Sequence, residues 1–487
     1  MSSGAAFLRF PTTRPRRPPM RHYPAISSSI WSSVSDPYPW RTLGAPGAKT
    51  KILSTNKKGP GCKHRSRSHG EGVEKCFCLT SSLIGSAKWL HTPKSVKPQI
   101  VCETKKAFSA HQKGILPLSM PTTRAKIWDM LRLLRHGGPA LCNVAVTNSC
   151  NATCDFCNFA NGKIPHKDLR WIDATRLDAA LQILHGRGIR YVSFFGGEPL
   201  LHPYIAEIVA LSIEKGMGTA LITNGWLLPA KLDELVGSGL KTIYISIDAA
   251  SIDAHEANRG LKRLGERIRA ATARMPRLGI TPIAQVTMSK LIKNYHLLAP
   301  FLRDLGFEAV AFSYPQRTRL GSSSLAWSDT SKLVDFTDRE LIEAFEAVDE
   351  LRTAFPVNNP HASIADMKRH LRGESEHFVC YGGYKSFYMD WNFDVWRCDA
   401  WRERMCSVWD FDKTPFVRDG CTACIADCYR DSSVMLHFAV SLGDTLDGIC
   451  EGRLVAALKT IANTRNLESL SAVFENARVR SRLARTG

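Results

Sequence analysis

The sequence predicts an α/β protein whose six parallel strands form a partial (β/α)6 barrel. Three observations favour this fold. Between residues 122 and 318, short apolar segments typical of buried strands alternate with segments of helical periodicity. The connections are long enough to hold the crossover helices that parallel strands need. Polar motifs directly follow several of the strands, and in such barrels the catalytic groups lie at the carboxyl ends of the strands.

The individual elements follow from hydrophobic patterning. Leu177, Ala180, Leu181 and Leu184 fall at i, i+3, i+4 and i+7, which is one face of a helix that ends near Gly186. The expected strands are 143–147, 191–195, 220–222, 242–247, 283–286 and 309–312. The other expected helices are 122–135, 205–212, 230–236, 264–274 and 297–305, followed by helices within 320–375 and 450–482.

Most of the net charge of +20 lies at one end of the 487-residue chain. Residues 1–119 hold 20 Lys and Arg against 4 Asp and Glu, a net charge of +16, so residues 120–487 carry only +4. We therefore expect no basic groove for nucleic acid. No apolar run is long enough to span a bilayer, and no secretory signal is recognisable, so a cytoplasmic protein is expected.

Residues 1–119 do not have the composition of a folded domain. They are rich in Pro, Ser, Arg and Lys and lack sustained periodicity, so they cannot bury enough apolar surface to offset the entropy of ordering. Two interpretations remain, a transit segment or an extension upstream of a true start at Met120. We favour the second, because the segment is much longer than targeting needs.

Three cysteines directly follow the first strand. Cys150, Cys154 and Cys157 have the CxxxCxxC spacing, and three thiolates of this spacing can hold one [4Fe–4S] cluster. The fourth iron then has no protein ligand and can accept a chelating substrate. The alternative is a structural zinc site, which needs four protein ligands. His166 is the nearby candidate for the fourth ligand.

Further motifs end the next three strands and make the pattern specific. They are Gly196-Gly197-Glu198-Pro199-Leu200, Thr223-Asn224-Gly225 and Ser246-Ile247-Asp248-Ala249. With the cysteines, this ordered set over about residues 140–315 resembles the radical S-adenosylmethionine (SAM) superfamily, in its molybdenum-cofactor and peptide-modifying branch. The resemblance implies a TIM-like barrel and a reduced [4Fe–4S] cluster that cleaves SAM to a 5′-deoxyadenosyl radical.

The resemblance also implies a role for each matched residue. Cys150, Cys154 and Cys157 would be the catalytic cluster ligands, and Phe156 would lie beside the adenine. Gly196 and Gly197 would let the backbone approach the SAM amino group, which Glu198 would help to fix. Asn224, Ser246 and Asp248 would meet the ribose or methionine part, although a turn or a strand-end cap is the alternative for these three.

A second group of cysteines lies near the C-terminus. Cys380 and Cys398 flank an expected hairpin of strands 387–390 and 395–397, and a CxxCxxxC follows. The pattern resembles the auxiliary-cluster extensions of radical SAM enzymes, called SPASM with two clusters and twitch with one. It implies an auxiliary [4Fe–4S] cluster on Cys380, Cys398, Cys421 and Cys424, with Cys428 as a substitute. Cys406, Cys428 and Cys450 could supply part of a second site, and a zinc ribbon is the alternative. Bulky Phe393 replaces the usual hairpin glycine.

The expected domains are an N-terminal extension, a radical SAM core, a helical linker, an auxiliary-cluster domain and C-terminal helices, at 1–119, 120–318, 319–375, 376–435 and 436–487. The expected function is hydrogen abstraction from a small-molecule substrate, in a cofactor, natural-product or lipid pathway, with flavodoxin or ferredoxin as electron donor. Modification of a ribosomal peptide is the alternative, disfavoured because only about twenty residues separate Met120 from the first strand. A non-catalytic iron–sulfur or zinc protein is the third hypothesis.

Overall fold

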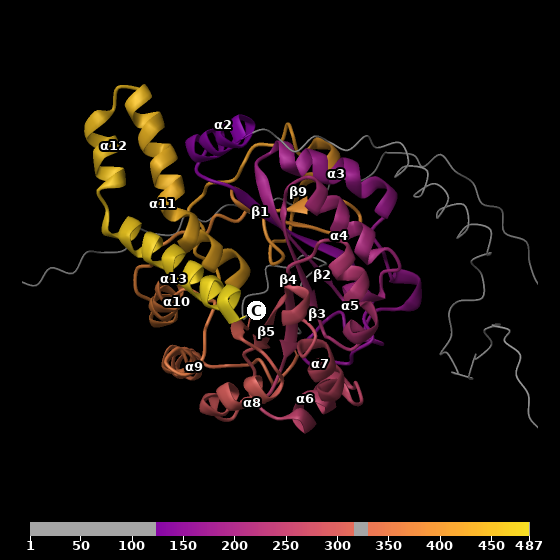
Figure 1. The fold of residues 1–487 in the computed structure, drawn as a ribbon. Coiled ribbons are helices and arrows are strands. Elements are labelled where there is room, and N and C mark those ends of the chain that lie inside the picture. Colours follow the sequence, from indigo (N-terminus) through magenta and orange to yellow (C-terminus); the bar gives the residue numbers. More distant parts are fainter. Residues whose placement is uncertain (1–122, 316–329, 487) are drawn as a thin grey trace, which may run out of the picture. The chain divides into compact units, whose positions relative to one another are not determined.

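The computed structural model describes residues 123–315 and 330–486. The expectation for residues 1–119 and the expected boundary at 318/319 both lie outside the described residues. Nine strands form one sheet in the order β6-β5-β4-β3-β2-β1-β7-β8-β9 (Figure 1). The strands are β1 (Ala140–Thr147), β2 (Ile189–Gly196), β3 (Gly218–Thr223), β4 (Thr242–Ile247), β5 (Thr281–Thr287), β6 (Ala309–Ser313), β7 (Ser386–Met389), β8 (Asp394–Trp396) and β9 (Arg404–Ser407).

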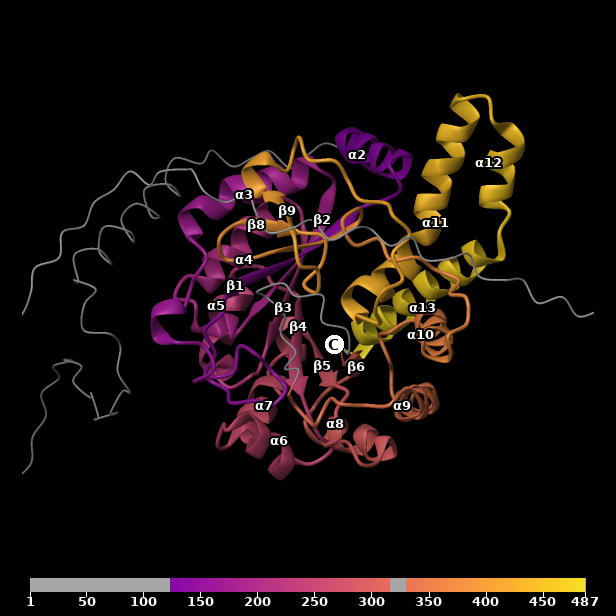
Figure 2. The ribbon, with the colours of Figure 1, turned by 180° about the vertical axis from the view of Figure 1, so that it is seen from behind.

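The first six strands pair in parallel in chain order, as the sequence predicts. Helices connect them, and Figures 1 and 2 show α3 to α8 in an arc along one side of the strands, with α9 to α13 gathered on the other side. The α-helices are α2 (Thr123–Arg135), α3 (Ala174–Gly186), α4 (Ile205–Glu214), α5 (Leu228–Gly237), α6 (Ile252–Arg259), α7 (Leu264–Thr272), α8 (Leu298–Asp304), α9 (Asp338–Leu351), α10 (His361–Arg372), α11 (Asp427–Cys450), α12 (Leu454–Ile461) and α13 (Thr464–Thr486).

The core lies between the sheet and the helices that follow its strands. Strand β1 is central and is buried along almost its whole length, as expected for a parallel strand that is covered on both faces. The predicted face of α3 is confirmed, because Leu177, Ala180, Leu181 and Leu184 are all fully buried. The α/β class and the partial barrel are thus confirmed. Within the described residues, no helix is both long and apolar enough to cross a membrane.

The hairpin between the C-terminal cysteines extends the barrel sheet. Strand β7 pairs in parallel with β1, and β8 and β9 continue antiparallel from it. Helix α11 contacts both ends of the parallel part of the sheet. Its Asp427 accepts a hydrogen bond from the backbone N–H of Tyr314, just after β6, and its Ser432 hydroxyl lies 2.8 Å from that of Ser386 in β7. The sequence pattern predicts a separate small extension here, whereas the structure joins these strands to the barrel sheet.

Helix α6 and the first part of α11, before residue 436, were not predicted, because their buried faces are not apolar. The buried residues of α6 are His255 and Arg259. Helix α11 buries mostly small and polar side chains, including Ser432, Ser441 and Gly443. Hydrophobic periodicity finds helices whose buried stripe is apolar, so neither of these gave a signal.

Candidate functional site

The loops after β1 and β2 lie against each other at the carboxyl end of the sheet. The N–H of Gly197 donates to the carbonyl of Thr147 at 2.7 Å, and the N–H of Glu198 donates to the carbonyl of Ser149 at 2.8 Å. A Cβ on Gly196 would lie 2.2 Å from the Thr147 carbonyl oxygen, and one on Gly197 would lie 2.1 Å from that of Ser149. Both glycines are therefore required by the approach of two backbones, a reason that differs from the expected approach to SAM.

Glu198 is buried and joins the ends of β2 and β3. Its carboxylate accepts hydrogen bonds from the Thr223 hydroxyl at 2.7 Å, the Asn224 N–H at 2.7 Å and the Leu200 N–H at 3.0 Å. Burial raises the pKa of Glu198, and these three bonds oppose the rise. An ionised carboxylate has about four acceptor positions, so this geometry leaves room for one more donor.

Asn224 links the third strand to the cysteine loop. Its side-chain amide donates to the Oδ1 of Asn151 at 2.8 Å, and its own Oδ1 accepts from the Trp226 N–H at 2.9 Å. The turn that was the alternative for Asn224 is therefore present. The Ser246 hydroxyl donates to the carbonyl of Thr223 at 3.2 Å, which ties β4 to β3. Asn151 was not predicted as a site residue.

The three N-terminal cysteines gather where these loops meet. Cys154 is buried and Cys150 and Cys157 are partly buried, and each thiol is close enough to at least one of the others to influence its pKa. Burial raises the pKa of all three thiols, that of Cys150 to about 12. Phe156, between the second and third cysteine, is buried in the main core. Three sulfurs at one strand end are a donor set that suits an iron–sulfur cluster.

Asp248 lies at the base of this group and is fully buried. Its Oδ1 accepts a hydrogen bond from Arg259 at 2.6 Å, and its Oδ2 accepts one from the Asn258 amide at 2.8 Å. Burial is the largest single effect and raises the pKa of Asp248, but the charge and hydrogen bonds of Arg259 and His255 together lower it by more, and the pKa ends below its ordinary value. The expected contact of Asp248 with SAM therefore competes with a carboxylate already paired inside the protein.

Arg259 is another residue of this site that sequence reasoning missed. Its charge lowers the pKa of Cys150 and Cys154, against the larger effect of burial, so its guanidinium lies close to both thiols. Its carbonyl accepts from the Thr153 N–H at 2.9 Å, which fixes the cysteine loop on the end of α6. A lone buried carboxylate needs a partner, so Asp248 was the one signal in the sequence that such a cation must exist.

His255 completes this buried group. Its Nδ1 lies 3.2 Å from the backbone nitrogen of Asp248 and 3.7 Å from the Asp248 carboxylate, and burial lowers the pKa of the imidazole. The ring is therefore neutral. Its Nε2 and the Arg259 Nε are buried and have no hydrogen-bond partner among the described residues. Polar atoms left in this state beside the cysteines fit a site that a further group completes.

The C-terminal cysteines also come together. Cys398 packs with Ala400, Ala426 and Tyr429, and Cys380, Cys424 and Cys428 pack against the same group. Cys421 joins them, because its carbonyl accepts from the Cys380 N–H at 2.8 Å and its thiol influences the pKa of both Cys380 and Cys424. The five predicted sulfurs therefore lie in one region, around the start of α11.

Cys406 and Cys450 lie elsewhere, so they cannot complete a second site with Cys428. Cys406 is in β9, paired with Val395 and packed against the main core. Cys450 ends α11 and is exposed, whereas Cys428 is in its first turn. At 1.5 Å per residue, the two ends of this helix are about 33 Å apart. The three cysteines therefore do not lie together, and the possibility of a second site that uses all of them finds no support in this geometry.

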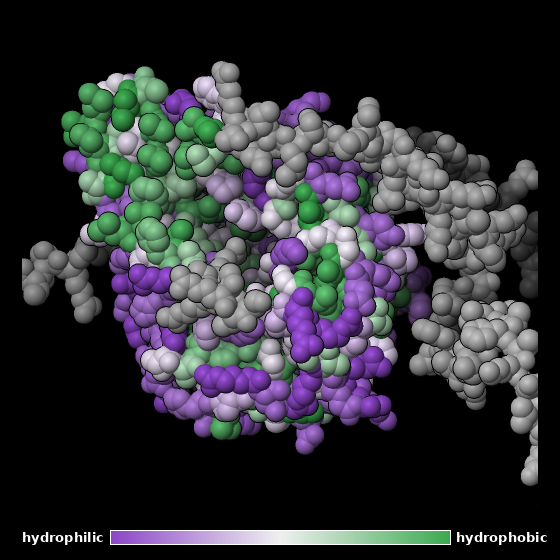
Figure 3. Space-filling view, viewed as in Figure 1, coloured by the Kyte–Doolittle hydropathy of each residue, from purple (hydrophilic) through white to green (hydrophobic). Residues whose placement is uncertain are grey.

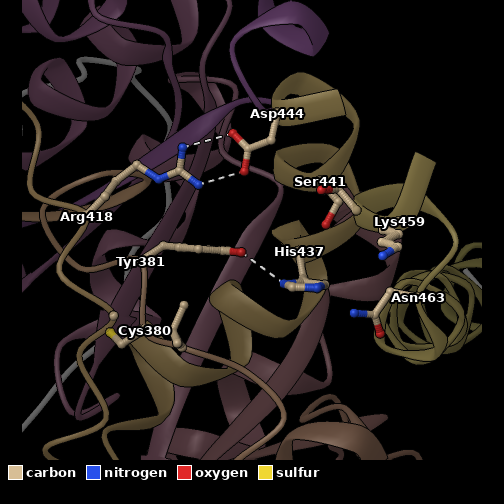
Figure 4. Close-up of a pocket in the computed structure, with 11 residues that line it drawn as sticks. Cys380, Tyr381, Arg418, His437, Ser441, Asp444, Lys459 and Asn463 are labelled. Carbon is tan, nitrogen blue, oxygen red and sulfur yellow. Dashed lines mark hydrogen bonds and ion pairs between the residues drawn. The ribbon is translucent and has the colours of Figure 1, made fainter. Parts of the chain in front are cut away.

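A pocket opens beside the C-terminal cysteines (Figure 4). Its cavity of about 490 Å³ is lined by Cys380 and by residues of the 418–420 loop, α11 and α12. Arg418 and Asp444 form a bidentate ion pair at its edge, with distances of 2.9 and 2.8 Å. The Tyr381 hydroxyl lies 2.9 Å from His437 Nδ1, and Figure 4 shows Lys459 on the opposite side from Arg418.

Within 123–315 and 330–486, no group of three His, Cys, Asp or Glu side chains has the arrangement that holds a single metal ion. The described cysteines form no disulfide.

The comparison with protein families decides what the N-terminal site belongs to. Residues 144–293 match the model of the radical SAM superfamily. This part of the chain is a radical SAM domain. It includes all three cysteines, both glycines, Glu198 and the Asp248–Arg259 pair.

Relatives match the same region. The GTP 3′,8-cyclase of Chlorobaculum tepidum is 34% identical over 151 residues, which are 31% of this chain and 44% of that protein. The AdoMet-dependent heme synthase of Methanosarcina barkeri is 29% identical over 167 residues, 33% of this chain and 47% of that protein. The chain thus spans less than half the length of either relative. Streptococcus suis SuiB bound to SAM aligns with 17% identity and a TM-score of 0.42, over 62% of this chain and 70% of that one.

Proposed function

We propose that this protein is a radical SAM enzyme that removes a hydrogen atom from a small-molecule substrate. The observation that carries the proposal is the convergence of Cys150, Cys154 and Cys157 with the β2–β3 loops inside a radical SAM domain. Such a domain takes a [4Fe–4S] cluster and SAM. When bound and reduced, the cluster supplies the electron that cleaves SAM to methionine and a 5′-deoxyadenosyl radical.

The chain's own residues position and shield these groups. Cys150, Cys154 and Cys157 would hold the cluster. Glu198 keeps one acceptor position for the ammonium of SAM, because three of about four are used by the protein. Arg259 places a positive charge next to the thiolates, which offsets part of the negative charge that a bound cluster would bring.

The remaining site residues are proposed with the roles that the resemblance implies. Phe156 would lie beside the adenine, and Asn224 and Ser246 would meet the ribose or methionine part of SAM. Asp248 would act mainly through Arg259, since its oxygens already accept from Arg259 and Asn258. Gly196 and Gly197 would shape the turn that presents Glu198.

The C-terminal cysteines are proposed to hold one auxiliary [4Fe–4S] cluster. Cys380, Cys398, Cys421 and Cys424 supply four thiolates, and Cys428 lies in the same group. Such a cluster could accept an electron from a substrate radical and give net oxidation. We propose residues 120–318 as the catalytic core and 376–435 as the auxiliary-cluster part.

The substrate class follows from the named relatives. A GTP cyclase and a heme synthase are, by name, enzymes of small molecules, which supports a small molecule over a ribosomal peptide here. We propose a cytoplasmic enzyme that receives electrons from a flavodoxin or ferredoxin.

The test is cleavage of SAM by the anaerobically reconstituted full chain with dithionite as reductant. We expect 5′-deoxyadenosine by liquid chromatography, and its loss in Cys154→Ala. The matched control is Cys450→Ala, because Cys450 is exposed at the far end of α11. Cleavage that persists in Cys154→Ala would contradict the proposal.

A further inference from the structure

The exposed apolar side chains of this protein are concentrated at one place. Of the 16 large apolar side chains that the described residues expose, 7 lie between the end of α11 and α13, and 4 lie on α2. Ile449, Leu454, Val455 and Leu458 form what we call the hairpin patch, at the α11–α12 hairpin. Figure 3 shows apolar residues gathered over these helices, in contrast with the polar surface below them. A contiguous apolar surface of this kind marks an interaction site.

The hairpin patch exists because α12 uses only one narrow face for packing. Ala457 is its buried residue, close to Gly448 of α11, and its carbonyl lies 3.3 Å from the Thr445 hydroxyl. The apolar residues on the other faces stay in solvent, with Val455 at 70%, Leu458 at 61% and Leu454 at 56% exposed. The helix is thus anchored by one alanine and presents its larger side chains outwards.

Cations border the hairpin patch. Lys459 directly follows Leu458 and lines the pocket of Figure 4, and Arg465 lies at the start of α13. Neither forms an ion pair with any residue within the described ranges. An apolar surface with basic neighbours is complementary to a partner that is apolar inside and anionic outside.

Helix α2 presents a second surface of this composition next to α11. Its Trp128 is 62% exposed and its Leu131 is 48% exposed. Arg135 joins the helix to α11 through an ion pair of 3.2 Å with Asp447. Figures 1 and 2 draw α2 and α12 at the same end of the molecule. An exposed tryptophan beside basic residues is typical of a membrane–water interface.

We propose that the α11–α12 hairpin docks on the surface of an anionic lipid bilayer. The hairpin patch would enter the boundary between head groups and acyl chains, while Lys459 and Arg465 would contact lipid phosphates. A second copy of the chain is a poorer occupant, because a symmetric contact through the patch would bring Lys459 and Arg465 of one copy towards the same cations of the other. The proposal places the protein on a membrane surface through this hairpin, and no helix of the described part of the chain is long and apolar enough to cross a bilayer.

The test measures co-sedimentation of the full chain with lipid vesicles. One set of vesicles is phosphatidylcholine alone, and the other contains roughly 30% phosphatidylglycerol as the anionic lipid. We expect binding only to the anionic vesicles, weakened by salt. The triple variant Leu454→Gln, Val455→Gln, Leu458→Gln should bind at least about tenfold more weakly, because it loses most of the buried apolar area. Lys459→Gln with Arg465→Gln should also weaken binding and reduce its salt dependence.

The matched control is Leu297→Gln, since Leu297 is 54% exposed in the 3-10 turn Tyr295–Leu297, before α8 and away from the hairpin. It should bind as the wild type does. Hydrogen exchange should slow over 449–461 when anionic vesicles are added, and should be the same in free wild type and triple variant elsewhere, which shows that the variant folds.

Four results would overturn the proposal. They are no binding to anionic vesicles, equal binding to neutral vesicles, unchanged binding of the triple variant, or a dimer that the triple variant abolishes. The third would assign vesicle binding to residues 1–119 or another surface, and the fourth would assign the patch to a second copy. None of these measurements depends on SAM cleavage.

Discussion

Asp248 and Arg259 form a buried ion pair at the carboxyl end of β4, with Arg259 Nη2 2.6 Å from Asp248 Oδ1. The pair joins two functions. It compensates the charge of the buried Asp248 carboxylate, and it holds the Arg259 guanidinium beside Cys150 and Cys154. The helix that supplies Arg259 also supports the cysteine loop, because the Arg259 carbonyl accepts from Thr153 N–H.

Removal of one partner of this pair should be strongly destabilising. Asp248→Asn leaves the Arg259 charge buried without compensation, so we expect the free energy of unfolding to fall by about 3–5 kcal/mol. The measurement is urea denaturation followed by circular dichroism. The double variant Asp248→Asn, Arg259→Met should be more stable than Asp248→Asn alone, because it buries no unpaired charge. Additive losses would show that the two residues do not interact.

The turn after β2 should not tolerate a side chain. Gly197→Ala would place a Cβ 2.1 Å from the Ser149 carbonyl oxygen, and backbone must move to relieve this contact. We expect a loss of about 3 kcal/mol or more, by thermal or urea unfolding. The control is Gly186→Ala at the end of α3, where a Cβ meets nothing within 4 Å. It should leave stability unchanged or raise it by up to about 1 kcal/mol. Equal effects at the two positions would show that the turn is not tightly packed.

Iron should remain bound when the N-terminal cysteines are removed. The variant without Cys150, Cys154 and Cys157 is expected to retain about four irons after anaerobic reconstitution, held by the C-terminal group. Metal analysis and the spectrum of the reduced protein measure this. About eight irons would indicate two auxiliary clusters, which the distance between Cys428 and Cys450 along α11 argues against. Zinc in place of iron would favour a structural ribbon.

Phe393 adopts a conformation that glycine prefers. Its φ is +64°, and its side chain is buried against Trp409 with ring centroids 5.4 Å apart. Phe393→Ala loses the packing and keeps the strain, whereas Phe393→Gly loses the packing and relieves the strain. We expect both to be less stable than wild type, by about 3–5 kcal/mol for alanine and about 1 kcal/mol less than that for glycine. Thermal unfolding of both variants gives the order. An alanine variant at least as stable as the glycine variant would refute the argument.

Asp431 should make stability fall as pH rises through the weakly acidic range. Burial raises its pKa from 3.8 to about 6, in spite of hydrogen bonds from Ser363 and Asn359. Between pH 4 and 6 the folded state therefore binds more protons than the unfolded state, so its stability decreases with pH and is constant above. Relative to Asp431→Asn, wild type should lose up to about 3 kcal/mol over this range. Urea unfolding at several pH values measures the difference, and a pH-independent difference would contradict the raised pKa.

The sequence by itself determined the barrel and the end of the sheet at which the candidate site lies. Alternating strand and helix patterns, with polar motifs directly after the strands, predict that Cys150, Glu198, Asn224 and Asp248 lie at one end of the sheet, since parallel strands have their carboxyl ends together. The three cysteines lie within eight residues of each other, so they are close in space in any fold of the rest of the chain. The site residues predicted from these motifs are brought together, although their roles toward SAM remain proposals.

Tertiary structure alone decided which groups satisfy each other. Asp248 pairs with Arg259, eleven residues away, and no hydrophobic pattern marks a helix whose buried face is His255 and Arg259. The pairing of β7 with β1 joins strands separated by more than two hundred residues, so no local signal could give its register. The length of α11 likewise separates Cys428 from Cys450. In each case the partner is chosen by burial and packing between distant segments, and these depend on the whole fold.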